Sequence, residues 1–182
     1  MSNSERNERP VFLVKNRIYV SAGVLPYTVE EDGTRSFLVQ KILDCKWKYE
    51  DFGGKSDIGD TCIEDVAFRE CAEEMNNVGP ITREYLKSQL KDNRSVIYRI
   101  PDDKYMLYII YVPIDLKNTL NLEIYGNVND DHTTRKVEWI SYKNLIETND
   151  NDLHPRFIPV DFKNNLPLLM SHSLLGGESK YY

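Results

Sequence analysis

The feature that most constrains this chain is the segment at residues 61–75, which carries a helical start signal and a helical apolar repeat. Thr61 and Glu64 fit the capping box, in which a hydroxyl and an acidic side chain three residues later satisfy the first amides of a helix. Apolar residues recur at helical spacing and can form a buried stripe: Ile63, Val66, Ala67, Cys71 and Met75. The segment therefore predicts an amphipathic helix with one side against a core.

The same helix carries a concentrated acidic face. Glu70 lies three residues before Glu73 and four before Glu74, so these side chains share a face. Each like-charged pair costs roughly a few tenths of a kcal/mol. A hard divalent cation would offset this repulsion, and carboxylate oxygens suit Mg²⁺, which keeps several waters and is completed by substrate phosphates. A solvated acidic face is the alternative interpretation.

Residues just before the helix favour the metal interpretation. Gly53 and Gly54 are paired glycines, which let a backbone pass close to a ligand, and Lys55 follows them and could touch a phosphate. Arg69 can pair with Asp60 or with a helix carboxylate and hold it in position. The alternatives are a tight turn for the glycines, a surface lysine, and an ordinary ion pair of little energetic value for Arg69.

Aromatic side chains gather ahead of the glycines, at Trp47, Tyr49 and Phe52. Aromatic faces suit stacking on a base, although aromatics beside a sheet more often belong to the core. We expect at most one of them to meet the substrate, and we assign Tyr49 to that role.

Strand signals surround the helix. Asp32 and Gly33 form a hairpin turn signal between two apolar segments, and Ser141 is a candidate cap for a short helix. The expected strands are residues 17–28, stopped near Pro26, then 36–43, 96–100, 105–112 and 135–140; the expected helices are 61–75, 81–90, 141–146 and a terminal one within 155–170, with a loop at 47–55. This order predicts a mixed α/β domain with a curved mixed sheet between helices.

The segment at residues 54–76 resembles the box of the Nudix hydrolase family. That box reads Gly, five residues, Glu, seven residues, Arg-Glu, an apolar residue, any residue, Glu-Glu, any residue, Gly. Here Asp60 replaces the first Glu, eight residues rather than seven separate it from Arg69, and Asn76 replaces the final Gly. The turn before the helix must absorb the extra residue, and Asn also accepts left-handed geometry. The Arg-Glu-apolar-x-Glu-Glu core is intact.

The resemblance extends over roughly residues 17–146. Residues 49–54 are similar to the family's aromatic-x-x-Pro-Gly-Gly segment, with Phe52 in the proline position, and residues 136–145 resemble its late strand and helix. The resemblance implies a Nudix-like α/β/α sandwich with a curved mixed sheet. We expect one domain at residues 11–175, a disordered segment at 1–10 and a flexible tail at 176–182.

The resemblance also implies an activity, which is Mg²⁺-dependent cleavage of the pyrophosphate bond in a nucleoside diphosphate linked to another group, with Mn²⁺ as an alternative ion. The proton acceptor would be one of the box glutamates or a carboxylate before the late strand, where Asp130 and Asp131 rank ahead of Glu123. The implied catalytic residues are Glu70, Glu73, Glu74 and Arg69; the metal ligands are Glu70, Glu73 and Glu74; the substrate-binding residues are Gly53, Gly54, Lys55 and Tyr49.

The composition of the chain bears on its cellular location and on its binding partners. The sequence has no run of 18 apolar residues and no apolar stretch near Met1, so we expect neither a membrane span nor a secretory signal. Its 3 cysteines lack metal-site spacing, which favours free thiols and a cytoplasmic location. The net charge of −6 argues against tight, sequence-independent binding to nucleic acid, although a local basic groove would still allow it.

Two other functions compete with small-nucleotide hydrolysis. The first is removal of the 5′ cap from mRNA, for which a basic track could be built from Lys41, Lys46, Lys48, Lys87, Lys91 and Arg94. The second is a nucleotide-binding module of the same fold that has lost turnover, which the intact glutamate core argues against. The sequence leaves the identity of the substrate, the phosphorus attacked and the oligomeric state open.

Overall fold

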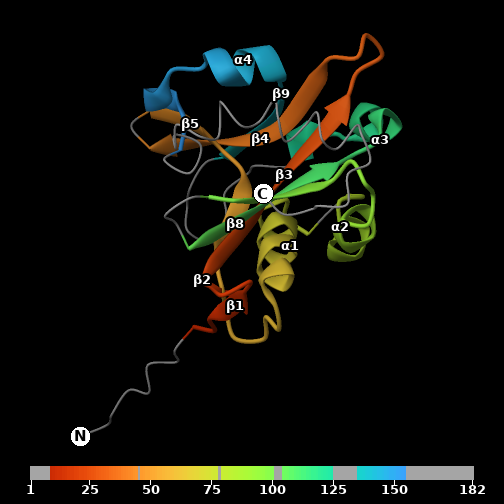
Figure 1. Ribbon diagram of the computed structural model, residues 1–182. Helices are drawn as coiled ribbons and strands as arrows, with labels where there is room; N and C mark the ends of the chain where they lie inside the picture. Colours follow the sequence, from red (N-terminus) through yellow and green to blue (C-terminus); the bar gives the residue numbers. More distant parts are fainter. Residues whose placement is uncertain (1–8, 45, 78, 101–103, 125–134, 155–182) are drawn as a thin grey trace, which may run out of the picture.

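The computed structural model describes residues 9–44, 46–77, 79–100, 104–124 and 135–154. Its strands are β1 (Phe12–Val14), β2 (Arg17–Tyr19), β3 (Ser21–Val29), β4 (Arg35–Asp44), β5 (Lys46–Glu50), β6 (Phe52–Lys55), β7 (Val96–Arg99), β8 (Tyr105–Tyr111) and β9 (Arg135–Ser141). Its α-helices are α1 (Ile63–Glu74), α2 (Arg83–Gln89), α3 (Ile114–Thr119) and α4 (Tyr142–Glu147), with 3-10 turns η1 (Leu122–Ile124) and η2 (Asp150–Asp152). Figure 1 shows these elements along the chain.

Within the described residues, one seven-stranded mixed sheet organises the fold. The strand order is β5-β4-β3-β8-β7, with β6 also paired to β3 and β9 also paired to β4. Strands β3 and β8 run parallel, whereas the other pairs in this sheet are antiparallel. The mixed sheet expected from the sequence is therefore confirmed.

Helices lie on both faces of this sheet, each over its own apolar core. On one face, Val66 and Phe68 of α1 pack with Leu38 and Tyr108, and α2 joins through Leu86. On the other face, Leu145 of α4 belongs to a second apolar cluster, whose larger members include Tyr27, Phe37 and Tyr98. Figure 1 shows α1 and α4 on opposite sides of the strands. This α/β/α layering is the arrangement that the sequence predicts.

Strand β3 is the buried centre of the sheet, and it continues through Pro26 to Val29. The expectation that the strand stops near Pro26 is thus wrong. Strand β6 pairs with β3 only as far as Val24, and β4 pairs with it only from Tyr27 onward. Pro26 lies between these two ladders, where the missing amide of proline costs little.

Helix α1 begins later than the capping box predicts. Its N-cap is Cys62, which makes no side-chain capping bond. The backbone amide of Thr61 donates to Asp65 Oδ2 at 3.1 Å, and its hydroxyl donates to the same carboxylate. The pairing of Thr61 with Glu64 is therefore wrong, because the helix starts one residue later and Asp65 is then the side chain that reaches back.

The end of α1 follows the expectation for Asn76. Asn76 and Asn77 both have left-handed backbone, with φ of 56° and 51°. Their amides donate to Glu73 O at 2.8 Å and to Ala72 O at 2.7 Å, which satisfies carbonyl groups at the end of the helix. Asn76 thus takes the left-handed geometry that the sequence predicts for it.

Residues 47–55, expected to be a loop, are mostly strand. They contribute to β5 and β6, and Gly53 pairs with Gly23 in the central strand. Glycines predict turns locally, but here close contact between two strands requires them. Helix α3 and the β1–β2 hairpin were not expected from the sequence; the turn residues of the hairpin, Lys15 and Asn16, both have positive φ.

Several expectations fall outside the described residues. These are the terminal helix within 155–170, the tail at 176–182 and residues 1–8 of the N-terminal segment. In the part of the chain that is described, no helix is long and apolar enough to span a membrane.

Candidate active site

The carboxylate of Glu70 lies directly against Gly54. Glu70 projects from α1 toward strand β6, and a Cβ atom added at Gly54 would lie 2.6 Å from Glu70 Oε1. Any side chain at this position would meet the carboxylate. Gly54 is therefore required by its neighbour across the helix–strand contact. Burial raises the pKa of Glu70, and the charge of Arg69 opposes that shift.

Arg69 connects Glu70 to the rest of the acidic face. Its Nη1 donates to Glu70 Oε1 at 2.9 Å and to Glu73 Oε2 at 3.0 Å. Its Nε and Nη2 donate to the two oxygens of Asp60, both at 3.0 Å. Nη2 also donates to the backbone oxygen of Lys55 at 2.9 Å. Burial lowers the pKa of Arg69, but the bond to Asp60 and the charge of Glu70 outweigh it and raise the pKa overall.

The turn before α1 absorbs the extra residue of the box. Gly59 takes a positive φ of 107°, and the amide of Asp57 donates to Asp60 Oδ2 at 2.7 Å. Asp60 donates its own amide to Asp57 O at 3.1 Å. This closed turn presents both Asp60 oxygens to Arg69, so the longer spacing leaves the arginine–aspartate pair intact.

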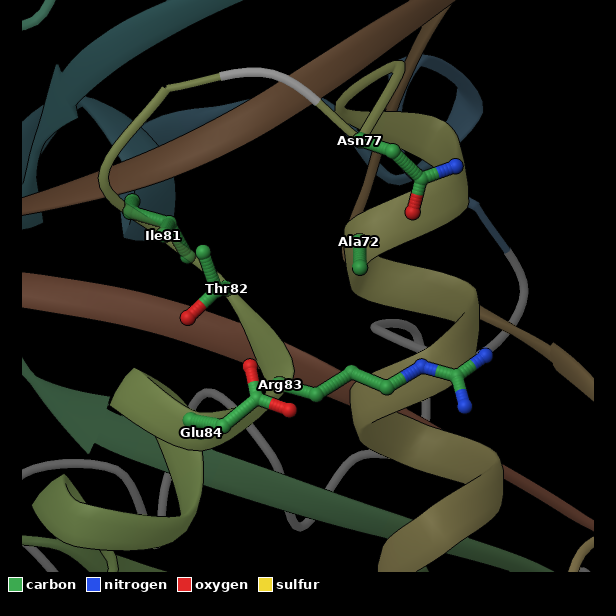
Figure 2. Close-up of a pocket in the computed structure, with 6 residues that line it drawn as sticks. All are labelled: Ala72, Asn77, Ile81, Thr82, Arg83 and Glu84. Atoms are coloured by element: carbon green, nitrogen blue, oxygen red, sulfur yellow. The ribbon is translucent and has the colours of Figure 1, made fainter.

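Glu73 lies at the outer edge of the acidic face, and 46% of its side chain is exposed. Besides Arg69, it has Arg83 Nη2 at 3.7 Å from its Oε1. Arg83 reaches across from α2 toward α1 over a hollow of about 170 Å³ (Figure 2). The hollow is lined by Ala72, Asn77, Ile81, Thr82, Arg83 and Glu84. This hollow lies beside the acidic face, and no local sequence signal indicates it.

Glu74 points the other way, into the sheet. It is 8% exposed, and its Oε2 accepts from Gln40 Nε2 at 2.9 Å. Arg135 Nη1 lies 2.5 Å from its Oε1. Burial raises the pKa of Glu74 to about 8; the charge of Arg135 opposes this shift, and the nearby carboxyl group of Glu50 adds to it.

A solved structure of another protein shares this architecture. A MutT/Nudix family protein from Listeria innocua is 16% identical and aligns over 85% of this chain and 95% of its own, with a TM-score of 0.50. The chain has the Nudix hydrolase fold. An Ap4A hydrolase from C. elegans, solved as a binary complex, is 19% identical over 86% of this chain and 98% of its own, with a TM-score of 0.48. RenU, a Nudix hydrolase from M. smegmatis, is 12% identical over 89% and 96%, with a TM-score of 0.45.

Other comparisons found no relatives. No family model matches the sequence, and no curated protein matches it either.

The three glutamates of α1 thus form two groups. Glu70 and Glu73 turn toward Arg69, whereas Glu74 turns toward Gln40 and Arg135. As these side chains stand, no three His, Cys, Asp or Glu residues in the described ranges are arranged to share one ion. The chemistry of the donors nevertheless fits a hard cation, because all three supply carboxylate oxygens from consecutive turns of one helix.

The expected substrate residues lie in different environments. Gly54 and the exposed Lys55 lie beside Glu70 and Arg69, at the end of β6. Gly53 is buried, and a Cβ there would lie 2.7 Å from Ala22 O, so protein atoms fill the space that a ligand would need.

Tyr49 is separated from the box. It packs with the apolar cluster on the sheet face opposite α1, its hydroxyl donates to Glu138 Oε1 at 2.9 Å, and Lys41 Nζ lies 4.2 Å from its ring centre. The structure therefore brings Gly54 and Lys55 to the acidic face and does not bring Tyr49 there.

The remaining candidate residues also lie in different environments. Phe52 is fully buried in the core beneath α1, so its ring cannot stack on a base. Glu123 is exposed on η1, near the end of α1, where Ile124 O accepts from Asn76. Asp130 and Asp131 lie outside the described residues, as does the side chain of Trp47.

Sequence reasoning missed Gln40 and Arg135, which hold Glu74. A glutamine within the apolar segment Phe-Leu-Val-Gln of β4 is the one available signal, because a polar side chain in a buried strand needs a partner. Arg135, at the start of β9, carries no local signal. Only the pairing of β9 with β4 brings it to Gln40 and α1.

Proposed function

We propose that this protein is a Nudix-type hydrolase that uses Mg²⁺ to cleave the pyrophosphate bond of a nucleoside diphosphate linked to another group. The observation that carries the proposal is the placement of the Arg-Glu-x-x-Glu-Glu core within a Nudix fold. Arg69 holds Glu70 and Glu73 together, and Glu70 lies against Gly54 beside the exposed Lys55.

Each box residue has a distinct part in this proposal. Glu70, Glu73 and Glu74 would hold Mg²⁺, with Mn²⁺ as an alternative. When bound, the ion supplies charge neutralisation for the phosphates and helps to activate the attacking water. Arg69 keeps two of the carboxylates in place through its bonds to both of them and to Asp60.

The proton of the attacking water needs an acceptor. A box glutamate, Asp130 or Asp131 would take it. Substrate phosphates would approach on the side of Gly54 and Lys55, because the strand edge and the acidic helix face meet there. We extend the proposal to one domain at residues 11–175 that works in the cytoplasm.

Two sets of side chains, the cysteines and the basic residues, bear on the proposed cytoplasmic location and on the RNA alternative. In the described part of the chain Cys62 and Cys71 form no disulfide, and burial raises the pKa of the Cys71 thiol, so it is not a reactive nucleophile. Three members of the basic track suggested for capped RNA pair with carboxylates: Lys41 with Glu138, Lys87 with Asp65 and Arg94 with Asp92. These pairs reduce the positive charge that an RNA backbone would meet, so we favour a small nucleotide as the substrate.

A substrate panel tests the proposal. Nucleoside triphosphates, ADP-ribose, nucleotide sugars, dinucleoside polyphosphates and capped RNA are each incubated with the protein and Mg²⁺ or Mn²⁺, and in parallel with EDTA. Turnover in ¹⁸O-labelled water, followed by mass spectrometry, identifies the phosphorus that is attacked. We expect metal-dependent hydrolysis of at least one small nucleotide. Binding without turnover across the panel would favour the inactive module, and cleavage of capped RNA alone would favour decapping.

A further inference from the structure

Arg135 lies beside Glu74, where it would compete with a metal ion for that carboxylate. Its Nη1 is 2.5 Å from Glu74 Oε1 and 3.3 Å from Gln40 Oε1. The amide of Gln40 donates to the other oxygen of Glu74 at 2.9 Å, and to Asp51 O at 2.9 Å. The side chains of Arg135 and Glu74 are only 11% and 9% exposed. Both oxygens of Glu74 are thus engaged, one by the buried Gln40 and the other by Arg135, whose side chain is mostly covered.

The surroundings of this pair are acidic. Glu50 and Asp51 are buried, and both act electrostatically on Glu74. Glu50 also has His154 Nε2 at 3.6 Å. Burying several carboxyl groups together is unfavourable unless a cation accompanies them. Arg135 supplies positive charge directly to Glu74.

Arg135 differs from Arg69 in origin and in effect. Arg69 belongs to the box itself and ties Glu70 and Glu73 of α1 to Asp60 in the turn before that helix. Arg135 comes from β9, which reaches this place by pairing with β4. It draws Glu74 toward the sheet and away from the other two glutamates.

We propose that Arg135 is an internal cation that competes with a divalent metal for Glu74 and thereby sets the metal affinity of the site. This inference rests on the proposed function, because it takes Glu74 as a metal ligand. A metal that recruits Glu74 must break the buried pair with Arg135. Arg135 is a positioning residue in this scheme, since it acts through Glu74.

The test measures Mn²⁺ binding without substrate. Wild type, Arg135→Gln and Lys136→Gln are titrated with Mn²⁺ at constant ionic strength, with free Mn²⁺ followed by electron paramagnetic resonance. Lys136→Gln is a matched control because it removes the same charge from the next residue, whose side chain is 64% exposed and pairs with Glu138. We expect Arg135→Gln to bind Mn²⁺ about tenfold tighter than wild type, because no buried pair is broken. The control should bind like wild type.

A double variant checks that the effect passes through Glu74. Adding Glu74→Gln to Arg135→Gln should abolish the gain, since the carboxylate that was released is gone. Persistence of the gain in the double variant would overturn the proposal. Equal Mn²⁺ affinity of wild type and Arg135→Gln would also overturn the proposal. So would a failure of both wild type and Arg135→Gln to bind Mn²⁺.

Thermal unfolding gives a second readout. In EDTA, Arg135→Gln should melt below wild type, because Glu74 is left buried without its cation. Mn²⁺ should raise the Tm of Arg135→Gln more than that of wild type. If Arg135→Gln does not fold with or without Mn²⁺, Arg135→Lys replaces it. A lysine keeps the charge but loses the fork geometry, so Mn²⁺ should bind severalfold tighter than to wild type, and unchanged affinity would overturn the proposal.

The hydrolase proposal and this inference can fail separately. Tighter Mn²⁺ binding in Arg135→Gln, together with no hydrolysis of any nucleotide, would support the competition and reject the proposed activity. Metal-dependent hydrolysis by wild type, together with unchanged Mn²⁺ affinity in Arg135→Gln, would do the reverse.

Discussion

The Glu70 carboxylate lies against Gly54, so closely that a Cβ atom at Gly54 would be 2.6 Å from Glu70 Oε1. This contact joins the glycine pair of β6 to the acidic face of α1. Neither residue can move alone, because Arg69 holds the carboxylate and the pairing of β6 with β3 holds the glycine.

Gly54→Ala should displace the Glu70 carboxylate and lower kcat by about a hundredfold, the order expected when a catalytic group moves by about 1 Å. Steady-state kinetics on the substrate found in the panel would measure it. Gly33→Ala is the control. It strains the backbone, whose φ is +80° there, but its Cβ would meet no atom within 4 Å, so it displaces no carboxylate. Equal kinetics for Gly54→Ala and wild type would contradict the role of the contact.

Glu73→Gln and Glu74→Gln should each remove most turnover while the fold survives. The expected loss is about a hundredfold or more in kcat, since each change removes a carboxylate that would hold the metal ion. Glu147→Gln, an exposed residue on α4 at the opposite side of the sheet, should retain wild-type rates. Circular dichroism would confirm folding. Near-wild-type rates in both box variants would reject the metal assignment.

Arg69→Lys should lower both activity and stability. A lysine cannot bond Asp60, Glu70 and Glu73 at once, whereas the guanidinium does so with distances of 2.9–3.0 Å. We expect a loss of about 2–4 kcal/mol in the free energy of unfolding, measured with urea. Arg83→Lys is the comparison, because its pair with Glu73 is exposed and longer, at 3.7 Å, and should change stability by less than about 1 kcal/mol. Similar losses in both variants would contradict this ranking.

Asp65 should make the stability of the protein depend on pH. The hydroxyl of Thr61 lowers the pKa of Asp65 in the folded state, with burial opposing and Lys87 assisting. A carboxylate whose folded pKa lies below its unfolded value stabilises the fold above the unfolded value, and this contribution is lost as pH falls through the folded pKa. Asp65→Asn should therefore cost about 1 kcal/mol near neutral pH and progressively less in acid. Urea unfolding of both proteins across acidic pH would test it, and a difference that does not vary with pH would refute it.

Local sequence was sufficient for much of the fold. The helix at residues 61–75 was predictable because its apolar stripe and its glutamates follow the helical repeat, which depends on neighbours within one chain segment. The hairpin around Gly33 and the short helix after Ser141 followed from equally local signals, and the side chain of Ser141 indeed accepts from Asn144 N at 3.2 Å. The intact box core pointed to the fold that the solved structures share.

Long-range contacts account for what the sequence did not show. The Gly53–Gly54 segment became a strand because β3 pairs with it, although glycines alone predict a turn. Spacing put Glu74 on the same face as Glu70, but burial beneath the sheet turned it toward Gln40 and Arg135, residues far from it in the chain. A periodic pattern records which side of a helix is polar. It does not record which distant strand supplies the partner, because that depends on the pairing of β9 with β4 across most of the chain.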